Sequence, residues 1–328
     1  MARTLVTGVT GYVGGRLVQD LLDAGHEVVC LARSPAKLAR REWFDDVTVV
    51  SVDVRDVQGT TAAMEGCDAA FYLVHSMDGE GDFARRDREM ADAFREAAEA
   101  AGIGRIVYLG GLGIEDDDVL SEHLRSRHEV GRTLAGGTVP VIELRAAVVI
   151  GSGSASFEML RHLVDVLPVM VTPRWVNTRC QPIAIRDVLT YLCGAVSIDV
   201  EADEHRILEI GGPDILTYRE MMVIFAEVAG LRPRIIVPVP VLSPSLSSHW
   251  VGVVTPLPLG LARPLVASLV NEVVADTSAV DSLIPRECLP FTTAVRLALR
   301  RVDDLEVLSS WADAELVRDE IVSPRTGS

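Results

Sequence analysis

A glycine-rich turn near the start of the chain constrains the fold more than any other feature of the sequence. Residues 3–6 are typical of a short buried strand, and residues 16–22 have the pattern of a helix that stops at Gly25. Between these segments lies the sequence Thr7-Gly8-Val9-Thr10-Gly11-Tyr12-Val13-Gly14. Glycines at this spacing between a strand and a helix predict a phosphate-binding turn, because the helix N-terminus offers N–H groups and a partial positive charge. An ordinary glycine-rich loop is the alternative interpretation.

Each glycine of this turn has its own task in a dinucleotide site. Gly8 takes the tight turn, Gly11 has no side chain to keep a pyrophosphate away from the backbone, and Gly14 lets the helix pack closely. We therefore expect a dinucleotide to contact the turn through Thr7, Gly8, Thr10, Gly11, Tyr12, Val13 and Gly14.

The residue after the next strand indicates which dinucleotide binds. Residues 27–32 are typical of a second strand, after which an NAD-selective site places Asp or Glu. This chain has Arg33 there, followed by Ser34 and Lys37. A guanidinium can bind a 2′-phosphate bidentately, whereas a carboxylate repels it. The sequence therefore predicts NADP as the cofactor, with NAD as the alternative. Arg33 as a merely solvated charge is the other interpretation.

Short apolar runs alternate with helical patterns through the first half of the chain. The expected later strands are residues 47–52, 69–74, 105–109 and 139–144. The expected helices between them are residues 83–101 and 120–134. Repeated units of this kind predict an α/β fold, a Rossmann-type doubly wound parallel sheet. Three residues beside strand ends are expected to contact the cofactor: Asp53, Val54 and Val74. We expect Asp53 to accept a hydrogen bond from the adenine amino group.

The pattern changes after about residue 150, where proline and short elements become frequent. We predict a dinucleotide-binding core over residues 1–150 and a small mixed α/β substrate lobe over residues 151–328, interleaved with the core. Within the lobe, residues 207–210 are typical of a strand. Residues 217–229 predict a helix that begins with a capping box. The apolar segment 237–270 is expected to supply much of a substrate pocket or its cover.

Composition excludes several classes of protein. The formal net charge of −16 argues against binding to nucleic acid or to an anionic membrane surface. The apolar stretch 250–270 contains three prolines, which disfavours a membrane-spanning helix. Five cysteines without a C-x-x-C pair, and no metal-ligand spacing, indicate buried thiols in a reducing compartment. The chain enters a strand almost at once, so we expect a cytoplasmic protein that binds a small molecule; the sequence allows a homo-oligomer.

Several stretches of the chain resemble the short-chain dehydrogenase/reductase superfamily, and more closely its atypical, extended-like branch. That branch includes the NADP-binding subunit of respiratory complex I and regulators that bind dinucleotide without turning it over. The resemblance implies a Rossmann core that binds NAD(P) and a small C-terminal lobe that binds substrate. Besides the glycine turn, the resembling stretches are Asp53-Val54, Ile106-Val107-Tyr108-Leu109, Gln181-Pro182-Ile183-Ala184-Ile185-Arg186-Asp187-Val188 and Ile210-Gly211-Gly212-Pro213-Asp214-Ile215-Leu216-Thr217-Tyr218.

The chain departs from this superfamily at the catalytic residues, usually a Ser after the fifth strand and a Tyr-x-x-x-Lys on the next helix. Lys37 is the only lysine, so the Tyr-x-x-x-Lys pair cannot exist. The overlay places His123 at the Tyr position and Arg127 at the Lys position, four residues apart on one helix face. Gly110-Gly111 occupies the serine region. His123 could exchange a proton and Arg127 could hold the ribose hydroxyls. A plain polar helix face is the alternative.

These features predict an NADPH-dependent reductase of a small apolar carbonyl, quinone or activated alkene, with His123 and Arg127 as catalytic residues. The alternative is a non-catalytic NADP(H)-binding sensor or assembly protein, which the missing Ser, Tyr and Lys favour. A nucleotide-sugar epimerase fits less well, since it needs a strong tyrosine base. His75, after the fourth strand, either faces the cofactor or caps the strand, and we favour the cap.

Overall fold

A seven-stranded parallel sheet forms the centre of the computed structural model, which describes residues 1–75, 83–113, 120–238 and 266–303. The strand order is β3-β2-β1-β4-β5-β6-β11. The strands are β1 (Arg3–Val6), β2 (Glu27–Leu31), β3 (Thr48–Val50), β4 (Ala69–Tyr72), β5 (Ile106–Gly111), β6 (Val141–Ala146) and β11 (His205–Ile210). The predicted α/β fold with a Rossmann-type parallel sheet is confirmed.

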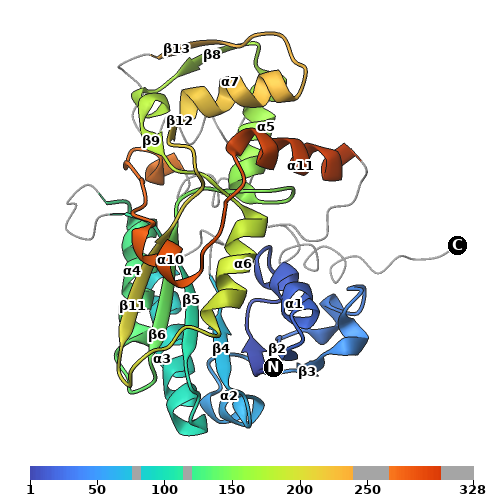
Figure 1. The fold of residues 1–328 in the computed structure, drawn as a ribbon, viewed down its shortest axis with the longest axis vertical. Coiled ribbons are helices and arrows are strands. Elements are labelled where there is room, and N and C mark those ends of the chain that lie inside the picture. The colour runs from blue at the N-terminus through green and yellow to red at the C-terminus, as the bar shows by residue number, and fades with distance from the viewer. Residues whose placement is uncertain (76–82, 114–119, 239–265, 304–328) are drawn as a thin grey trace, which may run out of the picture.

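Helices cover both faces of this sheet (Figure 1). On one face lie α2 (Val57–Met64), α3 (Phe83–Ala101) and α4 (Glu122–Leu134). On the other lie α1 (Gly14–Asp23) and α6 (Ile185–Ala195). Alternate strand residues serve the two faces, because successive side chains of a strand point in opposite directions. Thus Phe71 packs with the α1 layer and its neighbour Tyr72 with the α3 layer.

A second layer of short elements sits beyond the carboxyl end of the sheet (Figure 1). Its helices are α5 (Ala155–Val166), α7 (Tyr218–Val228) and α11 (Phe291–Asp303), whereas the short helix α10 (Ser278–Leu283) packs against β11 of the central sheet. Its short strands are β7 (Val149–Ile150), β8 (Val169–Thr172), β9 (Arg179–Cys180), β10 (Ile183–Ala184), β12 (Leu216–Thr217) and β13 (Ile235–Pro238). Short 3₁₀ helices occur at Pro35–Lys37, Phe44–Asp46 and Arg174–Asn177. A separate apolar core joins α5, α7 and α11.

The two layers share parts of the chain. β11 and α6 come after residue 150, yet β11 forms an edge of the central sheet and α6 packs on α1. Buried Asp187 ties α6 to the later chain, since its carboxylate accepts from Arg286 Nε at 2.6 Å and from the Leu289 N–H at 2.9 Å. The division at residue 150 stays a prediction. Within the described ranges, no helix is both long and apolar enough to cross a membrane.

Candidate cofactor and substrate site

A cavity of about 1240 Å³ runs along the carboxyl edge of the sheet. In open α/β folds this edge is where ligands bind, because the loops after the strands converge there. The cavity extends from the loop after β2, past α4, to α5 and α7. It is lined by every site residue that the sequence predicted: Thr7, Gly8, Thr10, Gly11, Tyr12, Val13, Gly14, Arg33, Asp53, Val54, Val74, His123 and Arg127.

The glycine turn is fixed by backbone contacts that exclude side chains. Gly8 has φ +67°, and a Cβ there would lie 2.4 Å from the Leu73 carbonyl oxygen. A Cβ on Gly14 would lie 2.4 Å from the Gly8 carbonyl oxygen. At Gly11 the one close neighbour of a Cβ is the Gly8 oxygen at 3.1 Å, so this glycine keeps the cavity open rather than the turn closed.

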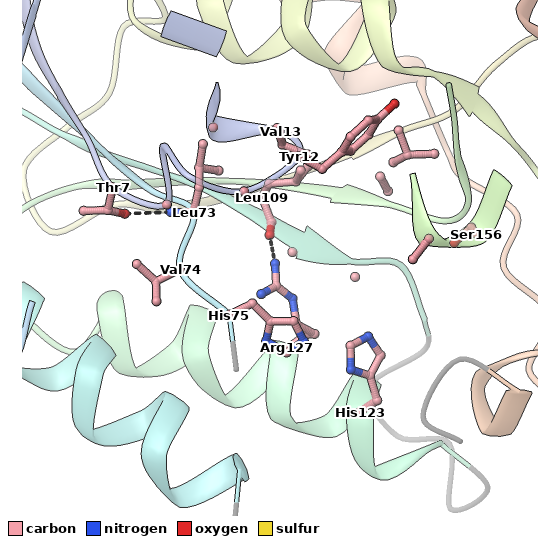
Figure 2. A pocket seen from close by; sticks show the side chains of 18 of the residues that line it. Thr7, Tyr12, Val13, Leu73, Val74, His75, Leu109, His123, Arg127 and Ser156 are labelled. Carbon is pink, nitrogen blue, oxygen red and sulfur yellow. Dashed lines mark hydrogen bonds between the residues drawn. The ribbon is translucent and has the colours of Figure 1, made fainter. Parts of the chain in front are cut away.

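Thr7 joins the turn to the end of β4. Its hydroxyl donates to the Phe71 carbonyl oxygen at 2.9 Å. The same hydroxyl accepts from the Leu73 N–H at 3.0 Å (Figure 2). Helix α1 then begins after Val13, which supplies no side-chain cap. An uncapped helix N-terminus facing a cavity is suited to a phosphate group. The turn therefore fits a dinucleotide pyrophosphate.

Three cationic side chains line the end of the cavity that lies near the loop after β2: Arg33, Lys37 and Arg55. Arg55 donates to both carboxylate oxygens of Asp53, at 3.0 Å and 2.8 Å. These hydrogen bonds lower the pKa of Asp53 to about 2. Asp53 is thus held as an anion by Arg55, a partner that the sequence analysis missed. Its contact with adenine stays a prediction. The cations suit a ligand that carries a phosphate at this end.

Arg127 connects α4 to the fifth strand. Its guanidinium donates to the Leu109 carbonyl oxygen (Figure 2) and lies over the Tyr108 ring, with 4.9 Å between Cζ and the ring centroid. Tyr108 in turn donates its hydroxyl to the Arg127 carbonyl oxygen at 2.9 Å. The charge of Arg127 is therefore held at the wall of the cavity, at the position where the overlay expected a lysine.

His123 lies one turn before Arg127 on α4, and its ring contacts that of His75, with 5.1 Å between centroids. Burial lowers the pKa of His123 well below its usual 6.5, and the neighbouring His75 and Arg127 lower it further. At neutral pH His123 is therefore an uncharged imidazole. In this form it can donate or accept a hydrogen bond. Its predicted role as a catalytic residue stays a prediction.

The depressed pKa of His123 predicts a stability effect at acid pH. Below about pH 6.5, the unfolded chain takes up a proton at this residue more readily than the folded chain does. This contribution to the free energy of unfolding is therefore intact above pH 6.5 and lost as pH falls towards the folded-state pKa. Urea unfolding at pH 7.5 and 5.5 should show a smaller pH dependence for His123→Gln than for the unmodified protein. Equal pH dependence, or an NMR titration of His123 with a midpoint of 6.5 or higher, would contradict this.

The serine region of the superfamily is closed by packing. A Cβ on Gly110 would lie 2.7 Å from Glu143 Oε1. Glu143 is fully buried and holds Arg145 Nε at 2.7 Å and His205 Nε2 at 2.8 Å, so it has little freedom to move away. A Cβ on Gly111 would lie 2.8 Å from Leu124 Cδ2. The close packing of β5 at Gly110 and Gly111 therefore leaves no room for the serine side chain.

The far end of the cavity is apolar. Its walls come mainly from α5, α7 and the segment after residue 266: Ala155, Met159, Leu160, Leu163, Trp175, Tyr218, Met221, Met222, Leu269 and Val273. Of the apolar segment 237–270, Ser268 and Leu269 line the cavity, Val237 is exposed, and residues 239–265 lie outside the described ranges. In the described part of the chain, no group of three or more His, Cys, Asp and Glu side chains could hold a metal ion.

Comparison with known proteins agrees with this geometry. Residues 8–136 match a family model described as NAD(P)H-binding. Divinyl chlorophyllide a 8-vinyl-reductase of Oryza sativa subsp. indica is 27% identical over 264 residues, which are 75% of this chain and 63% of that protein. NADH dehydrogenase (ubiquinone) 1 alpha subcomplex subunit 9 of Arabidopsis thaliana is 24% identical over 289 residues, 85% of this chain and 71% of that protein.

Among solved structures, NADPH-dependent quinone oxidoreductase QOR2 of Escherichia coli, complexed with NADPH, has the same fold. Its TM-score is 0.70 at 20% identity, and the match covers 89% of this chain and 98% of that one.

The chain therefore carries an NAD(P)H-binding domain of the Rossmann fold. The predicted resemblance to atypical short-chain dehydrogenases/reductases is confirmed.

Proposed function

We propose that this protein is an NADPH-dependent reductase of a small apolar carbonyl, quinone or activated alkene. The observation that carries the proposal is the composition of one cavity. A phosphate-binding turn and a cationic cluster occupy one part of its wall, and an apolar pocket occupies the other. Two relatives are a vinyl reductase and, at the level of fold, a quinone oxidoreductase, which supports this reaction type.

Different residues of the cavity would bind different parts of the cofactor. Arg33, with Lys37 and Arg55 beside it, would hold the 2′-phosphate, and the turn around Gly11 would hold the pyrophosphate. Bound NADPH supplies a hydride. Arg127 would hold ribose hydroxyls and keep a positive field nearby. The apolar walls of α5 and α7 exclude water, which strengthens every polar interaction inside the cavity.

His123 would act on the substrate in its neutral form. A neutral imidazole can donate a hydrogen bond to an oxygen that gains negative charge, and this stabilises the charge as it develops. The lowered pKa makes His123 a poorer source of a proton at neutral pH. His123 would therefore orient and polarise the substrate.

The proposal is tested by following NADPH oxidation with a panel of quinones, enones and ketones. We expect turnover with at least one class. His123→Ala should lower that rate by about 10²–10³, the usual cost of one such donor, without changing NADPH affinity. Arg127→Ala should weaken NADPH binding instead, because it removes a donor and a charge near the ribose.

The non-catalytic alternative has one observation in its favour, the packing at Gly110 that closes the serine position. It predicts NADPH binding without oxidation across the whole panel. That result would contradict the reductase proposal and support a sensor or assembly protein.

A further inference from the structure

The proton that a reduction consumes has a better source than His123. We propose that His75, held by the buried carboxylate of Asp87, supplies this proton, so that the donor follows β4 rather than lying on α4. The inference rests on the proposed function, since it names a further catalytic residue for the same reaction. Figure 2 shows His75, His123 and Arg127 on one side of the cavity.

Asp87 is a carboxylate buried inside the protein. It lies on α3, is 2% exposed, and its Oδ2 is 2.8 Å from His75 Nδ1. Its charge acts on the phenols of Tyr72 and Tyr108, both fully buried, whose pKa values it helps to raise. A carboxylate in such surroundings is costly unless it is hydrogen-bonded to a cation or a donor. The hydrogen bond with His75 offsets this cost of burial.

The bond to Asp87 gives His75 two properties that a proton donor needs. The carboxylate accepts from Nδ1–H, which fixes the tautomer and the ring orientation and leaves Nε2 as the nitrogen that exchanges a proton. The carboxylate also stabilises a positive charge on the ring. His75 lines the cavity and contacts the ring of His123, so it reaches the region where His123 would hold the substrate.

His123 lacks these properties. It lies beside Arg127 and His75, both of which disfavour a positive charge on it. Both histidines line one cavity, but their neighbours differ in whether they favour a positive charge on the ring. His75 has the buried carboxylate of Asp87 beside its ring, so we assign the proton transfer to His75 and the polarisation of the substrate to His123.

The reduction of a carbonyl substrate balances in bonds, electrons and protons as follows. A C–H bond forms from the hydride, the C=O π bond breaks, and its electrons form an O–H bond with the Nε2 proton of His75. The nicotinamide is oxidised and the carbonyl carbon is reduced. His75 becomes neutral and is reprotonated, ultimately from solvent, before the next turnover. For an activated alkene, the proton goes to carbon in place of oxygen.

The first test uses His75→Ala in the full-length protein. We expect turnover to fall by about 10²–10⁴, the usual size of a general acid's contribution. NADPH affinity, measured by fluorescence titration, should not change. Added imidazole should restore part of the rate, because a free imidazole can enter the space of the lost ring and donate the proton. His26→Gln is the matched control: this histidine accepts from the Ala2 N–H at the opposite edge of the sheet, so its loss should leave turnover unchanged.

The second test does not depend on activity. Nitrogen NMR of the imidazoles should show a protonated Nδ1 on His75 in the unmodified protein. Asp87→Asn should shift this tautomer, because an amide can donate to Nδ1 where the carboxylate only accepted. The same variant should lower turnover and keep NADPH affinity, as expected for a positioning residue.

Two results would overturn this role for His75. One is full turnover by folded His75→Ala, or a loss that imidazole does not rescue. The other, which serves if that variant does not fold, is an unprotonated Nδ1 on His75 in the unmodified protein. Failure of the proposed function is a different result: no acceptor would be reduced by the unmodified protein, whatever the tautomer of His75.

Discussion

We expect Gly11→Val to abolish NADPH binding while the protein stays folded. A Cβ at this position meets one backbone atom, the Gly8 oxygen at 3.1 Å, and the branched side chain would extend into the cavity. That space is where the pyrophosphate should approach the backbone. Binding should weaken by about 100-fold or more, which corresponds to roughly 2.7 kcal/mol. Fluorescence titration with NADPH measures the loss.

Gly14→Val is the matched control for this experiment. It makes the same chemical change three residues later, where a Cβ would lie 2.4 Å from the Gly8 oxygen. This variant should lose folded protein, seen as a lower melting temperature or insoluble expression. Normal dinucleotide binding by a folded Gly11→Val protein would show that the turn does not hold the pyrophosphate.

The second large effect concerns cofactor choice. NADPH should bind more tightly than NADH, because Arg33, Lys37 and Arg55 surround the end of the cavity where a 2′-phosphate would lie. Arg33→Asp should reverse the order. It removes charged hydrogen bonds worth about 1.5–3 kcal/mol and adds repulsion, so NADPH affinity should fall by about 10- to 100-fold. Affinity for NADH should change little.

Arg40→Asp controls for the change in net charge. Arg40 is exposed and is not among the residues that line the cavity, so its replacement should leave the NADPH-to-NADH preference intact. Equal affinities of the unmodified protein for the two cofactors would contradict the assignment of Arg33 to the 2′-phosphate.

Much of the fold followed from local patterns in the sequence. The helix 83–101 has the predicted limits, because its apolar spacing and Gly102, at φ +69°, define both register and end. The capping box of α7 also formed as predicted, with Thr217 accepting from the Glu220 N–H and Glu220 accepting from Thr217 N–H. Strand limits were less predictable: residues 139–144 were expected, whereas β6 is Val141–Ala146. Apolar runs do not reveal where pairing with neighbouring strands stops.

The site was predictable where it depends on one short motif, and less so where distant residues meet. All predicted cofactor residues line one cavity, because the ends of parallel strands share an edge. Asp87 was missed, since a charged residue on a charge-rich helix gives no sign that tertiary packing buries it. For the same reason the sequence did not indicate that His75, placed either as a strand cap or facing the cofactor, pairs with Asp87 and contacts His123. Arg55 was missed because its side chain turns back to Asp53.

The most direct test of the proposed reaction is transfer of deuterium from NADPH labelled at C4 of the nicotinamide. The labelled cofactor is mixed with the protein and an apolar enone or ketone, and the product, which keeps the label on carbon, is analysed by mass spectrometry. With a quinone, whose hydroquinone O–D exchanges with water, the loss of label from the cofactor is measured instead. With an enone or ketone, a reductase should place one deuterium on carbon in the product, and from one face of the ring only, because a binding site would present a single face of the ring to the acceptor. NADPH that binds tightly but transfers no label to any of these acceptors would contradict the account.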